Sequence, residues 1–190
     1  RSGRIVLLEE VLDDAVKLAQ KHIEEKNPAL ENKAEVAEAV GVGAVVFHDL
    51  KNDRLNNFDF NLEEVVRFEG ETGPYVQYSH ARAMSILRKA GNPGLDAAGK
   101  YRLDDSEAWE TLRMLADFPA TVLKAVEEYE PSVIAKYGIH LAKAFNRYYA
   151  HSRILEDDDQ KEARLALVKS VAEVLKESLR LLGVKAPDEM

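Results

Sequence analysis

The amino-acid sequence predicts a mainly α-helical protein, a helical bundle preceded by a helical connecting segment with at most one short strand. Two observations predict this fold class. Apolar residues recur every three or four positions along most of the 190-residue chain, which is the spacing of helices that bury one face. Short polar turns with Asn, Pro and Gly separate these stretches, and short connections favour antiparallel neighbours in a bundle. Hydrophobic residues make up 46% of the chain, which is enough to bury a core.

The first third of the chain predicts two long helices and a shorter helical stretch. Residues 8–26 carry the helical spacing and end at Asn27-Pro28, because the residue before a proline disfavours the helical conformation. A second helix is expected at 33–50, and its later part is apolar on every side, which is typical of a buried segment. Residues 58–60 read Phe-Asp-Phe and predict a short strand or extended segment before helical spacing resumes at 62–68.

The remaining helices are expected after a connecting loop at residues 69–74. They are predicted at residues 75–90, 106–116, 122–129, 131–153 and 161–182. The first of them stops at Gly91-Asn92-Pro93-Gly94, and residues 95–104 are expected to form a loop. Trp109 lies on the apolar stripe of the second, and we expect its large side chain to be buried in the core.

Charge divides the chain near residue 72. The net formal charge is −8. Residues 1–72 contain 9 Lys and Arg against 16 Asp and Glu, a balance of −7, whereas residues 73–190 contain 17 against 18, a balance of −1. We therefore expect a connecting segment at 1–72 and a helical domain at 73–190. The acidity of the first segment suits a protein partner better than a nucleic acid.

Composition and motifs argue against several classes of protein. The chain has no cysteine, no secretory leader and no apolar run near the roughly 20 residues of a membrane helix, so we expect a soluble, cytoplasmic protein without a membrane partner. Its five histidines lack helix-spaced partners, and the acidic run at 156–159 lacks the glycine of a calcium loop, so no metal site is expected. Neither a phosphate-binding glycine loop nor a nucleophile elbow occurs, so no catalytic residue is predicted.

An acid-free window at residues 131–155 is the strongest candidate for a binding site. It contains four Lys or Arg residues together with three Tyr and one Phe. A tyrosine beside a cation supplies the two groups that bind an unstacked RNA nucleotide, a flat face for stacking and a positive charge for the phosphate. Lys143, Arg147 and Tyr149 are therefore predicted to contact RNA. Tyr148 shares the apolar face of this helix, so core packing and RNA contact both stay open for it.

Several runs of the sequence resemble arginyl-tRNA synthetases. Residues 68–82, FEGETGPYVQYSHAR, and the following SILRKA at 85–90 are similar to the junction that leads into the helical anticodon-binding domain of that family. Further runs resemble the family in the same order, LRML and FP within 112–119, YEPS at 129–132, FNRYY at 145–149, RLALV at 164–168 and the ending at 181–190. The resemblance covers essentially the whole chain.

The resemblance implies an anticodon-binding bundle of the class I synthetase type and a set of residues near the anticodon. In that family the helix with the Phe-Asn-x-x-Tyr pattern and the extreme C-terminus approach the anticodon. These features map here onto Arg147, Tyr148, Tyr149 and Met190. Arg82, on the first helix of the predicted bundle, is added to the set.

The resemblance also implies a larger parent enzyme. Residues 40–50 and 58–68 resemble the segment that joins the catalytic fold to the anticodon domain, and residues 1–4 resemble the stretch just past the catalytic lysine loop. The adenylation signatures of the family are not in the chain, so no catalytic activity of its own and no cofactor are expected. The implied parent joins arginine to its tRNA with ATP and magnesium. The implied partners are tRNA(Arg) and the catalytic domain of the same protein.

Two other classes of function compete with RNA binding. A helical protein-interaction or dimerisation domain without RNA binding is the main alternative, and the acidic first third and the negative net charge favour it. An independent helical enzyme is the third, and no candidate active site supports it.

Overall fold

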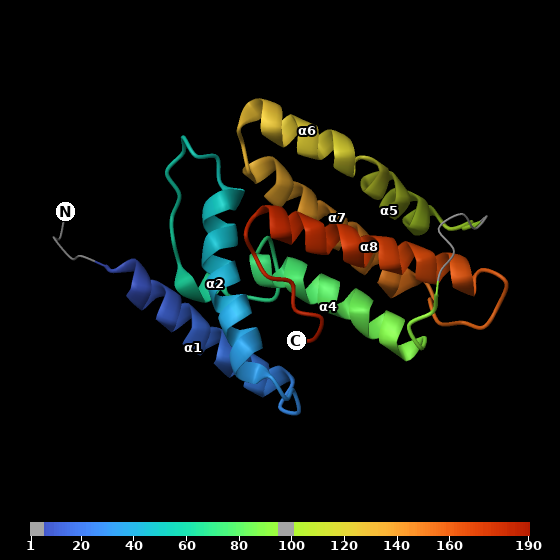
Figure 1. The fold of residues 1–190 in the computed structure, drawn as a ribbon, viewed down its shortest axis with the longest axis horizontal. Coiled ribbons are helices and arrows are strands. Elements are labelled where there is room, and N and C mark those ends of the chain that lie inside the picture. The colour runs from blue at the N-terminus through green and yellow to red at the C-terminus, as the bar shows by residue number, and fades with distance from the viewer. Residues whose placement is uncertain (1–5, 95–100) are drawn as a thin grey trace.

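The computed structural model describes residues 6–94 and 101–190, and within them the chain forms eight helices and no strand (Figure 1). The helices are α1 (Leu8–Lys26), α2 (Lys33–Lys51), α3 (Leu62–Val65), α4 (Gly73–Lys89), α5 (Ser106–Ala116), α6 (Phe118–Glu128), α7 (Ser132–His151) and α8 (Lys161–Leu181). The prediction of a mainly α-helical protein is confirmed. The resemblance noted for residues 1–4 and most of the predicted loop at 95–104 fall on residues outside this description.

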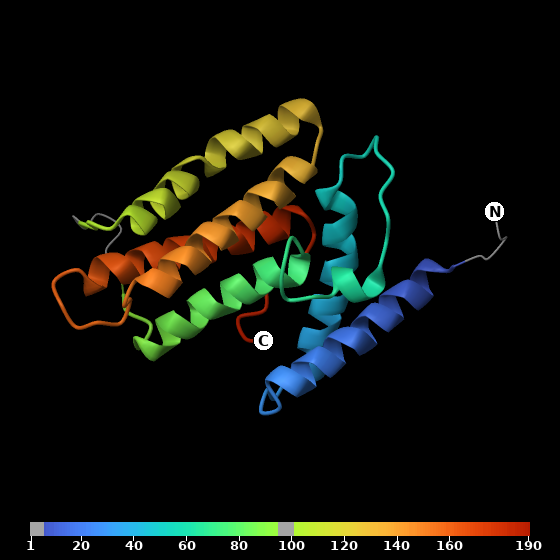
Figure 2. The ribbon, with the colours of Figure 1, turned by 180° about the vertical axis from the view of Figure 1, so that it is seen from behind.

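The first three helices share a small core. α1 and α2 cross each other closely, and α3 packs against both (Figure 2). The close approach is possible because α2 has Gly41 at the crossing, where an added Cβ would lie 2.6 Å from the backbone of Val16. The buried side chains of this core are Ala15, Ala19, Ile23, Leu30, Val36, Ala37, Val40, Ala44, Val65 and Val66.

The other five helices form the bundle, and α7 is its central element. It packs against α4, α5, α6 and α8 (Figure 2). Its apolar face repeats at helical spacing, and Leu141, Phe145 and Tyr148 on that face are completely buried. The predicted bundle therefore forms around the window that the sequence singled out.

α2 also takes part in the core of the bundle. Phe47 from α2 is buried among side chains of the bundle, and Gly73 at the start of α4 leaves room for its ring. Gly43 lies where a Cβ would come within 2.9 Å of Gln77 and Val184. The predicted boundary between residues 72 and 73 coincides with the start of α4. The division into two domains stays a prediction.

The segment between α2 and α3 connects the two parts of the molecule. Arg54 donates hydrogen bonds to the backbone carbonyl of Tyr129 and to that of Glu128, and it pairs with Glu130 at 3.2 Å. A cation at these carbonyls stabilises the C-terminus of α6. Phe58 and Phe60 form no strand, and their rings meet the edge of His48 at 5.1 and 5.7 Å between centroids.

The expectation that Trp109 lies in the core is wrong, because its side chain is 64% exposed. α5 turns the small residues Ala108 and Thr111 towards the bundle, and both are fully buried. A helix turns by about 100° per residue, so Trp109 points away from the face that its neighbour Ala108 buries. Leu112, one turn later, is only partly buried. The apolar stripe of α5 is wider than the surface that the bundle covers.

The C-terminal tail, residues 183–190, folds back over the bundle after α8. Gly183 has a φ of +71°, and the amide of Val184 donates to the carbonyl of Leu179 at 2.9 Å, which closes the helix in the manner of a Schellman motif. The tail then crosses α4 towards the turn between α1 and α2 (Figure 1). This path places the last residue beside the candidate site. No helix in the described ranges is long and apolar enough to cross a membrane.

Candidate RNA-binding pocket

A pocket of about 410 Å³ lies where α4, the last turn of α7 and the C-terminal tail meet the turn after α1. Its lining combines half-exposed aromatic rings, cations and one apolar terminal residue. The lining residues are Asn27, Tyr78, Ala81, Arg82, Ser85, Ile86, Arg88, Lys89, Tyr149, Glu189 and Met190. Three residues that the sequence predicted, Arg82, Tyr149 and Met190, come together here.

α4 supplies most of the residues that line the pocket. The start of this helix is fixed by a cap. Thr72 accepts a hydrogen bond from the amide of Tyr75 at 3.2 Å, and Pro74 occupies the first turn, where its missing amide hydrogen is not needed. Tyr78 and Arg82 are one helical turn apart and share a face. Arg82 donates to the Tyr78 hydroxyl at 3.2 Å, so the pair is fixed within one helix.

The Arg82 guanidinium lies between two tyrosine rings. It is 4.8 Å from the centroid of Tyr78 and 5.0 Å from that of Tyr149. It also donates to the side-chain oxygen of Asn146. The amide nitrogen of Asn146 in turn donates to the hydroxyls of Tyr75 at 3.0 Å and Ser79 at 2.8 Å, which fixes its orientation. The cation is therefore held in place before any ligand binds.

The two rings remain available to a ligand. Tyr78 is 37% exposed and Tyr149 is 43% exposed. An aromatic face next to a planar guanidinium is the arrangement on which unstacked nucleic-acid bases stack. The pocket therefore has the chemistry for a single-stranded base.

The C-terminus closes one side of the pocket. The backbone carbonyl of Met190 accepts a hydrogen bond from the side-chain amide of Asn27 at 3.1 Å, and the Met190 side chain packs against the core of α1 to α3. Arg88 pairs with Glu189 at 3.2 Å on the same side. A terminal residue frays unless something holds it, and these contacts hold this one.

A second hollow of about 640 Å³ adjoins the pocket along the end of α7. The two share Ile86, Lys89 and Tyr149, and the second extends to Arg153 and Leu155 on the loop between α7 and α8. Tyr149 therefore borders both hollows.

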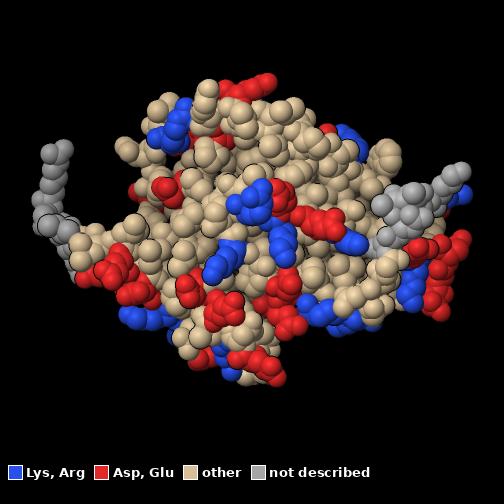
Figure 3. Space-filling view, in the orientation of Figure 1, with Lys and Arg blue, Asp and Glu red and all other residues tan. Residues whose placement is uncertain are grey.

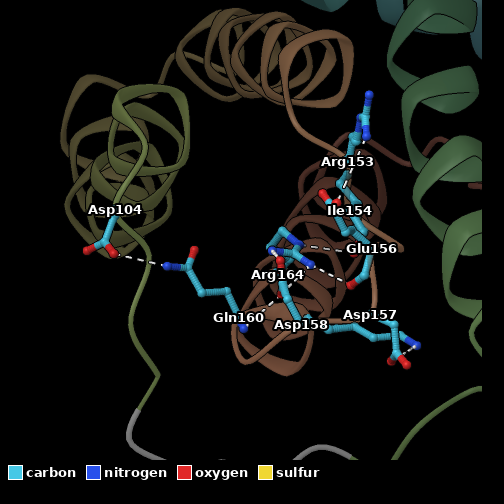
Figure 4. Close-up of polar contacts among 9 residues, drawn as sticks. Asp104, Arg153, Ile154, Glu156, Asp157, Asp158, Gln160 and Arg164 are labelled. Carbon is cyan, nitrogen blue, oxygen red and sulfur yellow. Dashed lines mark hydrogen bonds and ion pairs between the residues drawn. The ribbon is translucent and has the colours of Figure 1, made fainter.

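Arg164 holds the loop that borders this second hollow (Figure 4). Its buried guanidinium donates to the carbonyls of Ile154 at 3.2 Å and Glu156 at 2.7 Å, and it pairs with both carboxylate oxygens of Asp158 at 2.8 and 3.1 Å. The hydrogen bond from Arg164 lowers the pKa of Asp158. Arg153 is thereby presented to solvent from a braced loop, with Glu156 at 3.9 Å.

The chain as a whole is acidic, with a net formal charge of −8. On the face shown in Figure 3, Lys and Arg side chains lie among Asp and Glu side chains, and no extended surface of one sign is visible. An RNA ligand would therefore depend on the cations at the pocket and the adjoining hollow, Arg82, Arg88, Lys89 and Arg153, and not on the field of the whole molecule. Among the described residues, no cluster of His, Asp and Glu could hold a metal ion.

Comparison with known families identifies the fold that carries this pocket. The family described as the DALR anticodon binding domain matches residues 76–190. The chain belongs to this family. A second family, described as the catalytic domain of class I (R) tRNA synthetases, matches residues 1–62. Membership of the DALR family favours RNA binding over a protein-interaction domain.

The relatives that match this chain are named as arginine–tRNA ligases or arginyl-tRNA synthetases. It is 78% identical over 190 residues to an arginine–tRNA ligase of Ligilactobacillus salivarius and 72% identical to that of Lactiplantibacillus plantarum, in both cases over all of this chain and 34% of the relative. The arginyl-tRNA synthetase of Thermus thermophilus superposes with a TM-score of 0.90 at 39% identity, over all of this chain and 33% of that one. The chain thus spans about a third of the length of the relatives it matches.

Two of the predicted cations lie elsewhere on the DALR bundle. Lys143 pairs with Glu71 at 2.7 Å, and Arg147 pairs with Glu110 at 2.8 Å. The hydrogen bond from Lys143, followed by its charge, lowers the pKa of Glu71. Neither cation lines the pocket or the adjoining hollow.

Tyr148 is completely buried, so its ring is not available for stacking in this structure. The sequence left core packing and RNA contact open for Tyr148, and in this structure its side chain is packed in the core. Burial raises the pKa of its phenol.

The sequence did not single out Tyr78 or Asn27. Tyr78 carries a detectable signal, since it lies one helical turn before Arg82. Asn27 carries none, because only the folded chain brings it to Met190.

Proposed function

We propose that this chain is the anticodon-binding part of an arginine–tRNA ligase and that its pocket binds the anticodon loop of tRNA(Arg). The observation that carries this proposal is the Arg82 guanidinium fixed between the half-exposed rings of Tyr78 and Tyr149, in a pocket closed by Met190. Its volume of about 410 Å³ lies within the range of about 300 to 1,000 Å³ typical of pockets for small ligands.

Each element of the pocket has a distinct role in this proposal. A base that leaves the anticodon stack lies against the exposed part of the Tyr149 ring, and Arg82 holds that ring in place from the opposite face. Lys89 and Arg88 face the phosphates on either side. Met190 forms the apolar wall that limits the size of the base. Arg153, in the adjoining hollow, contacts the backbone of the next nucleotides.

The name of the relatives supports an enzymatic role for the parent protein. We propose that the parent attaches arginine to tRNA(Arg) with ATP and magnesium in the cytoplasm, and that this chain contributes binding of the tRNA and no catalytic residue. The match of residues 1–62 to a catalytic domain supports a partner surface there. Leu55, Phe58 and Phe60 are exposed apolar residues in that range, and we propose that they contact the rest of the catalytic domain.

The test is binding of tRNA(Arg) to the full-length protein, compared with the same tRNA carrying a changed anticodon. We expect the changed anticodon to weaken binding by about tenfold or more, because a lost stacking contact costs about 1–3 kcal/mol per base. Deletion of Met190 should weaken binding of the cognate tRNA, with at most a small fall in melting temperature from the loss of its contacts with Asn27 and the core of α1 to α3. Equal binding of both tRNAs would refute an anticodon site and leave only general tRNA affinity.

A further inference from the structure

The C-terminal tail is tied to α4 by three side chains on one side of that helix. Gln77 donates to the carbonyl of Lys185 at 2.7 Å, His80 contacts the carboxylate of Asp188 at 3.0 Å, and Arg88 donates to the carbonyl of Asp188 at 3.0 Å. Met190 lies two residues after Asp188. The position of the pocket wall therefore depends on how firmly α4 holds the tail.

The contact of His80 is unusual among these because both of its ring nitrogens face oxygen atoms. Nδ1 lies 3.0 Å from the backbone carbonyl of Ala172 on α8, and Nε2 lies 3.0 Å from the carboxylate of Asp188. The ring is 1% exposed, so water does not replace either partner. A carbonyl only accepts hydrogen bonds, so Nδ1 must carry a hydrogen.

The contact with Asp188 then needs a second proton. A neutral imidazole with its hydrogen on Nδ1 presents a lone pair at Nε2, and a lone pair facing a carboxylate oxygen is repelled. The geometry is satisfied when a proton lies between Nε2 and the carboxylate. The contact is therefore a hydrogen bond with a proton between the ring and Asp188.

Two cations hold the same stretch of the tail. Arg88 on α4 pairs with Glu189 at 3.2 Å, and Lys176 on α8 lies 3.8 Å from the Asp188 oxygen. Both cations are at least a third exposed, whereas His80 is buried between α4, α8 and the tail. The contact of His80 is therefore the one least open to solvent.

We infer that His80 is a positioning residue that holds Asp188, and through the tail holds Met190, at the wall of the pocket. Loss of this contact then weakens anticodon binding. This inference rests on the proposed function. It assigns to a buried histidine, which contacts no RNA, the task of ordering the residue that does.

The experiment changes Asp188 and not His80, because a half-exposed tail residue can be replaced without disturbing the core. In the full-length protein, KM for tRNA(Arg) and kcat for aminoacylation are measured for each variant. Asp188→Ala removes the contact, and we expect KM to rise by about five- to tenfold with kcat unchanged. Asp188→Asn keeps an amide that can form a hydrogen bond with the ring, so KM should stay near the wild-type value.

Glu177→Gln is the matched control. It removes the same charge from an exposed residue on α8 that pairs with Arg180 at 2.6 Å and lies outside the tail. We expect it to keep the wild-type KM. A wild-type KM for Asp188→Ala, or a KM for Asp188→Asn as high as that of Asp188→Ala, would overturn the inference.

A second measurement separates this inference from the proposed function. Hydrogen exchange of the backbone amides of residues 184–190 reports the order of the tail without any RNA. Asp188→Ala should speed this exchange, and Asp188→Asn should not. If the wild-type protein does not discriminate the anticodon, the proposed function fails while the exchange result still supports or refutes the contact with the tail.

Discussion

The guanidinium of Arg82 on α4 lies 5.0 Å from the centroid of the Tyr149 ring on α7. This relationship joins two helices that are distant in the sequence. Tyr149 remains 43% exposed, so part of its side chain is accessible to a ligand. A cation on one face of an aromatic ring holds the ring in place and leaves the other face for stacking.

The exposed face of Tyr149 predicts that ring stacking and not the hydroxyl binds the RNA. Tyr149→Ala should weaken tRNA(Arg) binding by about 1–3 kcal/mol, the cost of removing one stacking platform, whereas Tyr149→Phe should bind nearly as the wild type. Filter binding of the full-length protein measures both. Tyr129→Ala is the control, because Tyr129 is 81% exposed and lies outside the pocket. An equal loss from Tyr149→Phe would assign the contact to the hydroxyl.

Three of the six predicted site residues line the pocket. Arg82, Tyr149 and Met190 are predicted from residue chemistry and from the family resemblance together. Lys143 and Arg147 belong to the same predicted set, but helical spacing does not show which acids on other helices will reach them. Glu71 and Glu110 occupy them in the fold. Pairing between helices is a tertiary property, which a single sequence does not contain.

The pairing of Lys143 with Glu71 predicts a difference between two lysines. Lys89→Gln should reduce the slope of log affinity against log salt by about 0.7 to 0.9, which is the contribution of one phosphate contact. Lys143→Gln should change the slope less, because RNA would first have to displace Glu71 at 2.7 Å. Binding of tRNA(Arg) at several salt concentrations checks both variants. Equal slope changes would mean that the RNA also crosses the start of α4.

Two glycines in helices, Gly41 on α2 and Gly138 on α7, are predicted to have opposite effects on stability when each is replaced by alanine. Gly41→Ala places a Cβ 2.6 Å from the backbone of Val16, and overpacking of this kind costs about 1–3 kcal/mol of unfolding free energy. Gly138→Ala, inside α7, meets nothing closer than 3.7 Å, so it should stabilise the helix by up to about 1 kcal/mol. Urea denaturation measures both. A wild-type midpoint for Gly41→Ala would show that α1 moves away from α2 at little cost.

Helix positions are predictable because the apolar spacing and the Pro and Gly stops are local signals. α1 begins and ends at the predicted residues, and α8 ends one residue before the predicted limit. The side that a helix buries is less local. Trp109 belongs to the apolar stripe of α5, yet Ala108 and Thr111 are the residues of that helix that the bundle fully buries. How much of a stripe is covered depends on the neighbouring helices, which the spacing alone does not specify.

The pair of Arg164 and Asp158 predicts a pH-dependent contribution to stability. Arg164 lowers the pKa of Asp158 in the folded state, so the pair stabilises the fold above the ordinary Asp pKa of about 3.9. That contribution is lost as pH falls through the lowered folded-state pKa. Asp158→Asn should therefore lower the melting temperature at pH 7, and its difference from wild type should narrow in acid. Asp157→Asn is the adjacent control, because its carboxylate is 94% exposed and should matter little at either pH.

Two buried tyrosines on α7, Tyr137 and Tyr148, differ in how their hydroxyl groups are bonded. The Tyr137 hydroxyl donates to the carbonyl of Met114 at 2.7 Å, whereas the buried Tyr148 hydroxyl has no hydrogen-bond partner among the described residues. Burial raises the pKa of both phenols, so both stay protonated at neutral pH. The two residues differ mainly in the hydrogen bond that the hydroxyl gains on folding.

Removal of each hydroxyl should therefore have a different effect on stability. Tyr137→Phe loses a hydrogen bond and should lower the unfolding free energy by about 1 kcal/mol. Tyr148→Phe removes a buried polar group without a partner and should leave stability unchanged or raise it by up to about 1 kcal/mol. Its KM for tRNA(Arg) should not change, since the ring is buried. Weaker tRNA binding by Tyr148→Phe at unchanged stability would return Tyr148 to the binding site and imply that the end of α7 opens when RNA binds.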